Sequence, residues 1–170
     1  MSAALLQNNE KCNELEDDRE SCLHVLTWTA LCFTNHTILN GELSELLRPF
    51  NEMYEVEHGF KGGDLKMGML VFGHILERVK FDGRPHLDKL IADLTKMFAI
   101  RYERLPSASD MEPALYESLM NHRNTRMETL KKRDWLVKTF RRHLNAGSWP
   151  TSDEAVKQPT DDGRKRKRTR

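Results

Sequence analysis

The feature that most restricts the fold of this chain is the spacing of its apolar residues. Along most of the sequence they recur three, four and seven positions apart, which is the period of an amphipathic α-helix. One apolar stretch, residues 24–34 (HVLTWTALCFT), is rich in β-branched and aromatic residues, as a buried strand would be. We interpret it as a helix, because its neighbours have helical spacing and no partner strand is evident.

The sequence therefore predicts an all-α fold, a single-domain bundle of five to six helices with a disordered basic C-terminal tail. An acidic N-terminal segment, partly ordered, is expected at 1–19, the helical domain at 20–146 and the tail at 147–170. Within the domain, helices are expected at about 20–37, 42–57, 65–81, 86–104 and 109–144. We expect Pro49 to kink the second helix and a weak point at 121–125 to divide the last one.

The charges are distributed unevenly, although the net charge is only +1. Residues 1–120 carry 12 Lys and Arg against 20 Asp and Glu, whereas residues 121–144 carry eight against two. Residues 164–170 carry six against none. An acidic body with a basic final helix and a basic tail bears on the partners of the protein rather than on its fold.

The basic run at 164–170 (RKRKRTR) matches a monopartite nuclear localisation signal, in which consecutive cations at an exposed terminus fit acidic pockets on a nuclear import receptor. We therefore expect a nuclear protein and leave shuttling with the cytoplasm open. The same composition would serve a phosphate-binding arm, or merely a solubilising tail. The residues assigned to the signal are Arg164, Lys165, Arg166, Lys167, Arg168 and Arg170.

The second candidate site is the basic helix at 123–144 (RNTRMETLKKRDWLVKTFRRHL). Clustered cations beside an aromatic ring can bind phosphates while the ring stacks on a base. The alternative is a solvated face whose cations pair with the acidic body, with Trp135 at the edge of the core. The candidate nucleic-acid-binding residues are Arg123, Lys131, Trp135, Lys138, Arg141 and Arg142. The residues expected to face the core are Leu130, Leu136, Val137, Phe140 and Leu144.

Residue types that bind zinc occur at Cys22, His24, Cys32 and His36. On one helix, however, Cys22 and Cys32 would lie about 15 Å apart along the axis, which is too far to share an ion. We expect no metal, no cofactor and no catalytic residues, because no enzyme motif is recognisable. The odd number of cysteines indicates a reducing compartment. The uncharged stretch 21–41 is long enough to cross a bilayer but too polar, so we expect no membrane association.

Two hypotheses follow for the function. The first is a non-enzymatic nuclear interaction or regulatory protein, which binds an unidentified protein partner through its bundle and enters the nucleus through 164–170. The second is a nucleic-acid-binding protein, cellular or viral, which contacts RNA or DNA through the basic last helix and the tail.

Overall fold

The computed structural model describes residues 1–8, 10–57, 59–147, 149–151 and 154–159. These residues form a mainly α-helical fold with one two-stranded antiparallel hairpin. The elements in chain order are α1 (Ala3–Gln7), α2 (Leu15–Phe33), α3 (Asn40–Asn51), β1 (Tyr54–Val56), β2 (Gly59–Lys61), α4 (Asp64–Val71), α5 (His74–Glu77), α6 (Pro85–Ala99), the short 3₁₀ helix η1 (Ala108–Asp110), α7 (Pro113–Lys131) and α8 (Trp135–Asn145).

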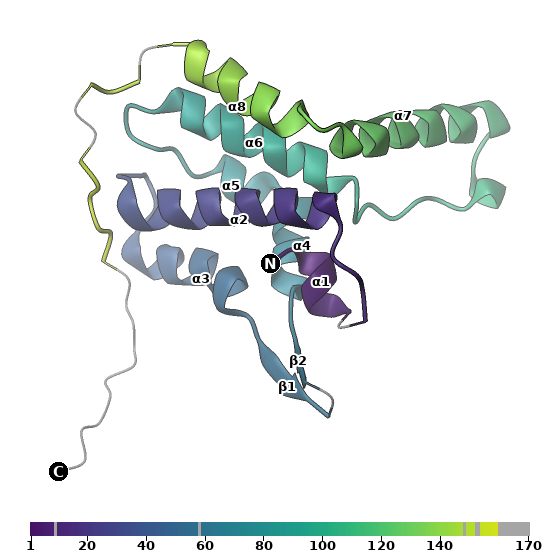
Figure 1. The fold of residues 1–170 in the computed structure, drawn as a ribbon, viewed down its shortest axis with the longest axis horizontal. Helices are drawn as coiled ribbons and strands as arrows, with labels where there is room; N and C mark the ends of the chain where they lie inside the picture. Colours follow the sequence, from purple (N-terminus) through teal and green to yellow (C-terminus); the bar gives the residue numbers. More distant parts are fainter. Residues whose placement is uncertain (9, 58, 148, 152–153, 160–170) are drawn as a thin grey trace.

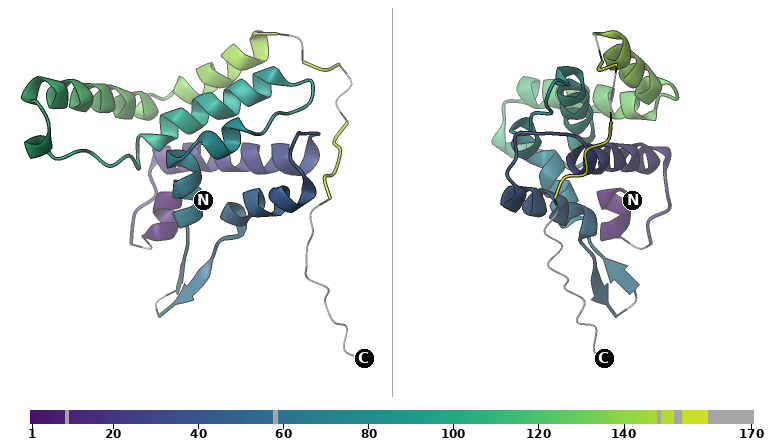
Figure 2. Two further views of the ribbon diagram at one scale, coloured as in Figure 1. Left: turned by 180° about the vertical axis from the view of Figure 1, so that it is seen from behind. Right: turned by 90° about the vertical axis from the view of Figure 1, so that its left-hand side faces the viewer.

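Helix α2 lies in the middle of the molecule, with α6 on one side and α3 on the other, and α8 covers α6 (Figure 1). Helix α7 leads into the start of α8, and its other end projects beyond the body, as the view from behind also shows (Figure 2). The hairpin projects on the other side, beyond α3 and α4. Most of α7 is therefore remote from the core, which lies between α2, α3 and α6.

The core is built from the apolar faces that the helical spacing predicts. Leu31 of α2, Leu43 of α3 and Leu94 of α6 are fully buried, and Phe98 of α6 joins them. Helix α6 begins at Pro85, whose fixed φ and missing N–H suit the first helical position. Helix α2, which covers most of the helix expected at 20–37, lies between α3 and α6.

The expectation of a pure bundle with five to six helices is wrong, because the chain also forms a hairpin and short helices. Tyr54 pairs with Lys61 and Val56 with Gly59 in the hairpin, within a segment expected to be helix end and loop. Its strands are three residues each, too short to show a period of two in the sequence. The expected helix at 65–81 is divided into α4 and α5 at residues 72–73.

The turn from the hairpin into α4 depends on Gly63. Its φ of +92° is a left-handed conformation, and a Cβ there would lie 2.6 Å from the carbonyl oxygen of Ala3. One carboxylate oxygen of Glu52 accepts hydrogen bonds from the backbone amides of Gly63 and Leu65, each at 2.9 Å, at the start of the helix. The close approach of Ala3 shows that α1 packs directly against this turn.

The basic segment is broken at 132–134 and not at the expected 121–125, which lies inside the continuous helix α7. The buried side chain of Arg19 reaches this break from α2 and donates to the carbonyl oxygens of Leu130 and Arg133. The bond to Leu130 satisfies a carbonyl group that the end of α7 leaves without a helical partner, and the bond to Arg133 reaches the junction that follows. The break therefore has a tertiary cause that the local sequence does not contain.

The break also changes which residues of α8 face inward. Leu130, Leu136 and Phe140 pack in or against the core, as expected. Val137 is 50 % exposed and Leu144 is 52 % exposed, so the expectation that they face the core is wrong. The expected core face treats residues 123–144 as one helix, and the break at 132–134 changes the direction in which every later side chain points.

A cluster of buried polar groups connects α1, the start of α2 and the end of α6, and we call Ser2, Asp17, Glu20, Arg101 and Tyr102 the buried ionic cluster. The Arg101 guanidinium lies 2.7 Å from the Asp17 carboxylate and also pairs with Glu20. Asp17 accepts from the Ser2 hydroxyl at 2.9 Å, and Glu20 accepts from the Tyr102 hydroxyl at 2.7 Å. Asp17 and Glu20 are both fully buried.

The contacts of the cluster determine the charge states of its members. Burial alone would raise the pKa of Asp17, but hydrogen bonds from Arg101 and Lys11 hold it well below the ordinary value. Burial likewise opposes ionisation of Glu20, whose pKa is nevertheless lowered by hydrogen bonds from His24 and the Ala3 amide. Both carboxylates are therefore charged at neutral pH and fully satisfied, which fixes α1 against the body.

Within the described residues, no helix combines the length and the apolar character that a bilayer crossing needs.

Candidate functional site

A groove of about 600 Å³ lies between α6 and α8, beside the junction of α7 and α8. We call it the basic groove, because four of its side chains are cationic and two are acidic. Its lining residues are Asp93, Lys96, Met97, Thr129, Lys132, Asp134, Trp135, Lys138, Thr139 and Arg142. Three helices and one helix junction thus contribute to a single concave surface.

Trp135 places α8 over α6. It is the first residue of α8, and its ring meets that of the fully buried Phe98 edge to face, with 5.6 Å between centroids. One turn later, the buried Thr139 hydroxyl donates to the Trp135 carbonyl oxygen at 3.0 Å. At the far end of α8, the buried His143 ring nitrogen lies 2.9 Å from the Asp93 carboxylate of α6. Helix α8 is therefore held at both ends, which fixes the width of the groove.

The four cations of the groove differ in their partners. Lys138 pairs with Asp134 one turn earlier, and that ammonium holds the pKa of Asp134 below its ordinary value. Arg142 pairs with Asp93 at 2.8 Å. For Lys96 and Lys132, both exposed, no anion within the described part of the chain forms an ion pair with the ammonium group.

Both ion pairs of the groove are largely open to solvent: the side chains of Arg142 and Asp93 are 64 % and 45 % exposed. Exposed ion pairs contribute only about 0–1 kcal/mol each. A phosphate that enters the groove can therefore compete for Lys138 and Arg142 at small cost, while Lys96 and Lys132 require no exchange of partners.

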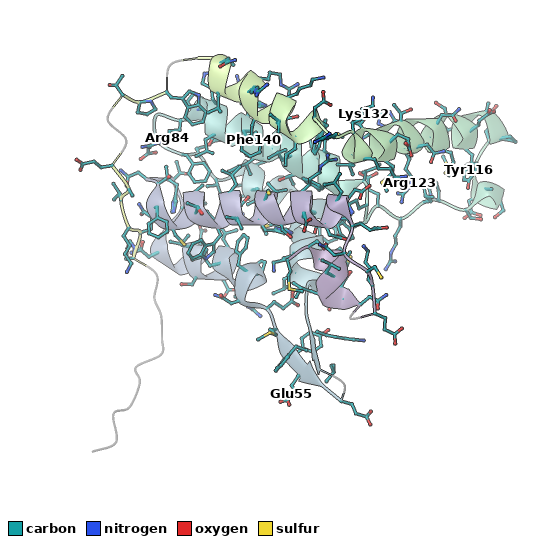
Figure 3. All side chains as sticks on the ribbon, viewed as in Figure 1. Glu55, Arg84, Tyr116, Arg123, Lys132 and Phe140 are labelled. Carbon is teal, nitrogen blue, oxygen red and sulfur yellow. The ribbon has the colours of Figure 1, made fainter. Side chains whose placement is uncertain are left out.

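The structure brings three of the six predicted residues together in this groove, namely Trp135, Lys138 and Arg142. The other three lie elsewhere: Arg123 donates to the Glu103 carbonyl oxygen at 3.1 Å, Lys131 pairs with Glu128, and Arg141 is exposed outside the lining of the groove. Figure 3 shows Arg123 on the projecting part of α7, whereas Lys132 lies at the junction with α8. The break before α8 thus separates Arg123 and Lys131 from the other four predicted residues.

Sequence reasoning missed two residues that complete the groove, Lys96 and Lys132. Lys96 belongs to α6, which is almost 40 residues away from α8 in the chain, so only the packing of the two helices brings it there. Lys132 is the C-cap residue of α7 and adopts an extended conformation. A sequence signal existed only for Lys132, because it stands beside Lys131 in a run of three cations.

The four cations of the basic groove are side chains of the kind that bind anions. Lysine ammonium groups and an arginine guanidinium are the side chains that proteins use to bind phosphates. The packing of Trp135 on Phe98 makes this ring part of the edge of the core, whereas the four cations of the groove are charged groups at its surface. Within the described residues, no cluster of three or more His, Cys, Asp or Glu side chains could hold a metal ion.

Other candidate residues lie apart from the basic groove. The zinc-type residues are spread along and after α2, with Cys22 exposed, His24 and Cys32 buried and His36 half-buried. The residues of the expected localisation signal, 164–170, lie outside the described residues.

An apolar groove of about 520 Å³ lies between α3 and α4. Its walls include Leu46, Leu65 and Met69, and Phe72 at its edge is 61 % exposed. Glu45, Arg48 and Asp64 also line this groove. Its composition is that of a surface that takes an apolar helix face or a ligand of similar character.

Comparison with models of known protein families, with curated proteins and with solved structures finds no match for this chain.

Proposed function

We propose that this chain is a non-enzymatic, nuclear, nucleic-acid-binding protein that contacts the phosphate backbone through the basic groove. The observation that carries the proposal is the meeting of Lys96 from α6 with Lys132, Lys138 and Arg142 from the α7–α8 region on one concave surface. Its lining places four cations against two carboxylates on a body that is otherwise acidic. A local excess of positive charge on an acidic protein directs an anionic ligand to that one face.

The geometry favours backbone contact without sequence preference. The groove offers ammonium and guanidinium donors to phosphates, whereas the ring of Trp135 packs against Phe98. Binding should therefore be strongly salt-dependent and similar for different sequences. The run 164–170 would deliver the protein to the nucleus and add nonspecific charge to the complex.

The test separates the groove from the tail. A full-length variant with the six cations of 164–170 replaced by Gln is compared with the unaltered chain for binding to labelled single-stranded RNA, single-stranded DNA and duplex DNA, from about 50 to 200 mM salt. Salt-dependent binding that remains in the tail variant supports the groove as the site. Loss of all binding in that variant would reduce the interaction to the nonspecific charge of the tail.

Import through 164–170 is tested independently. The full chain is fused to a fluorescent protein and its cellular distribution is compared with that of the same six-Gln variant. Nuclear accumulation that depends on the cations supports a localisation signal and an import receptor as partner. If the two fusions are distributed alike, the cations of 164–170 do not act as a localisation signal.

A second candidate function is the binding of a protein partner through the bundle, and the apolar groove between α3 and α4 favours it. An amphipathic helix could insert its apolar face between Leu46 and Phe72. The two functions are compatible, because the apolar groove and the basic groove share no lining residue.

A further inference from the structure

The C-terminal end of α2 is completed by a distant part of the chain. A helix leaves its last four carbonyl groups without helical partners, and in α2 these belong to Ala30, Leu31, Cys32 and Phe33. The first accepts from the Thr34 amide at 3.0 Å, and the second contacts the His36 ring nitrogen at 3.1 Å. The other two accept from the C-terminal segment: Cys32 from the Gln158 amide at 2.8 Å and Phe33 from the Val156 amide at 3.0 Å.

We call residues 154–159 the strap. Its two donors are two positions apart, which is the spacing at which an extended chain points successive amides to the same side. The Gln158 side-chain amide adds a hydrogen bond to Asn35 at 3.1 Å. Figure 1 shows the described parts of the C-terminal segment running past the ends of α6 and α2. The backbone amides of the strap therefore donate to two carbonyl groups at the end of α2.

The strap also forms one wall of a groove of about 760 Å³ between α2, α3 and the hairpin. Lys157 and Gln158 line this wall, opposite residues that include Arg48 and Tyr54. Cys32, which is 7 % exposed, lines the same groove from α2. Displacement of the strap would widen the groove and uncover this part of α2.

The strap is held by few contacts. Val156 is 44 % exposed and, of residues 154–159, only Gln158 is half-buried. Carbonyl groups at a helix end can exchange a protein donor for water, and segments with few buried apolar contacts open at low free-energy cost. Docking of the strap is accordingly expected to be reversible in the native protein.

We propose that the strap is a reversible intramolecular ligand of the α2 C-terminus and that its docking limits access to the basic run 164–170. The second half of this proposal rests on the proposed import function. With the strap docked at Gln158, five residues (159–163) separate this anchor from Arg164, a stretch that can span at most about 20 Å. With the strap released, the anchor at Gln158 no longer ties this part of the chain to the body. An import receptor that binds an extended chain would then meet less obstruction from the acidic body.

The test removes the two backbone N–H donors of the strap by replacing their residues with proline. Proline has no N–H, so the V156P/Q158P double variant loses both backbone hydrogen bonds to α2, together with the side-chain bond from Gln158 to Asn35. The matched control is Lys157→Pro, which places a proline in the same strap but keeps the amides of Val156 and Gln158. The first measurement is the rate of maleimide labelling of Cys32, in a full-length background in which the exposed Cys12 and Cys22 are Ser.

We expect labelling of Cys32 to accelerate on the order of tenfold in V156P/Q158P and to change little in Lys157→Pro, because the rate tracks the population of the open strap. Equal rates in the double variant and the unaltered chain would overturn the strap. Equal acceleration by Lys157→Pro would also overturn it, since the hydrogen bonds would not be what holds the segment.

The second measurement is nuclear accumulation of the same variants as fluorescent fusions. The proposal predicts faster accumulation of V156P/Q158P than of the unaltered chain, with Lys157→Pro unchanged. Faster labelling of Cys32 with unchanged accumulation would overturn the control of the basic run while leaving the strap in place. If the unaltered chain and the six-Gln tail variant are distributed alike, the import function itself fails, and the labelling rates still decide whether the strap exists.

Discussion

The guanidinium of Arg142 on α8 lies 2.8 Å from the carboxylate of Asp93 on α6, and the ring of His143 contacts the same carboxylate oxygen at 2.9 Å. This one acidic group joins the two helices that form the basic groove. It also places a negative charge in the groove where we propose that a phosphate binds. Asp93 is therefore expected to stabilise the groove and to weaken its binding of anions.

Replacement of Asp93 by Asn should separate these two effects. The amide keeps the shape of the side chain, removes one anion from the groove and releases Arg142. We expect the affinity for single-stranded nucleic acid to rise about twofold to fivefold at low salt and less at high salt, as for an exposed charge. Fluorescence anisotropy titrations measure this, with Glu117→Gln on α7 as the control that removes one exposed carboxylate elsewhere. A weaker complex with a correctly folded Asp93→Asn variant would contradict the expected place of the phosphate.

Trp135 should act as an anchor for α8 rather than as a base-stacking residue. Replacement by Leu keeps an apolar side chain against Phe98 but removes the larger ring, and we expect it to lower the free energy of unfolding by about 1–3 kcal/mol. The affinity for nucleic acid, measured where the variant is fully folded, should stay within about twofold. A loss of affinity of tenfold or more in the folded variant would favour stacking instead.

Arg101 should be essential for stability, because its removal leaves Asp17 and Glu20 buried without a cation. We expect Arg101→Met to lower the free energy of unfolding by about 3–5 kcal/mol in urea denaturation at pH 7. Arg104→Met, three residues later on the exposed surface, should change it by less than about 0.5 kcal/mol. Similar effects of the two replacements would show that the buried ionic cluster contributes little.

The buried ionic cluster and His24, which contacts Glu20, predict a free energy of unfolding that falls in two steps as the pH is lowered. Burial lowers the pKa of His24 against the raising effect of Glu20, so as pH falls below about 6.5 the unfolded chain binds a proton that the folded chain does not. The lowered pKa values of Asp17 and Glu20 give a contribution that is complete above about pH 5 and is lost as pH falls further, toward the folded values.

Urea denaturation at pH 7, 5.5 and 4 measures both steps. The replacement His24→Gln should remove the decline between pH 7 and 5.5 and leave the steeper loss below pH 5. An unchanged decline in the His24→Gln variant would assign the first step to another group.

Much of the helical architecture is predictable from the sequence because it depends on local spacing. The helix expected at 86–104 is observed at 85–99, and its apolar stripe enters the core. The hairpin, the division between α4 and α5 and the break at 132–134 were not predicted. The strands of the hairpin are too short to show a period of two, and the break at 132–134 is contacted by Arg19, which is more than 100 residues away in the chain.

The same distinction applies to the candidate site. Trp135, Lys138 and Arg142 share a helix face, so their proximity can be read from spacing. Lys96 comes from another helix and could not be connected with them before the packing of α6 and α8 was known. The buried ionic cluster was missed for a related reason, since Asp17 and Glu20 resemble solvent-exposed acids until Arg101, more than 80 residues away, is seen between them.

The most direct test of the account is the salt dependence of binding by the groove alone. In the full-length background with 164–170 neutralised by Gln, log Kd for single-stranded nucleic acid is measured against log salt concentration for the K96A/K132A variant and for Lys89→Ala, an exposed lysine of α6 outside the groove. We predict that the slope for K96A/K132A falls by about 1.4, because each of the two lost phosphate contacts contributes about 0.7. The Lys89→Ala variant should keep the slope of its parent. An unchanged slope for K96A/K132A, or an equal loss for Lys89→Ala, would contradict this prediction.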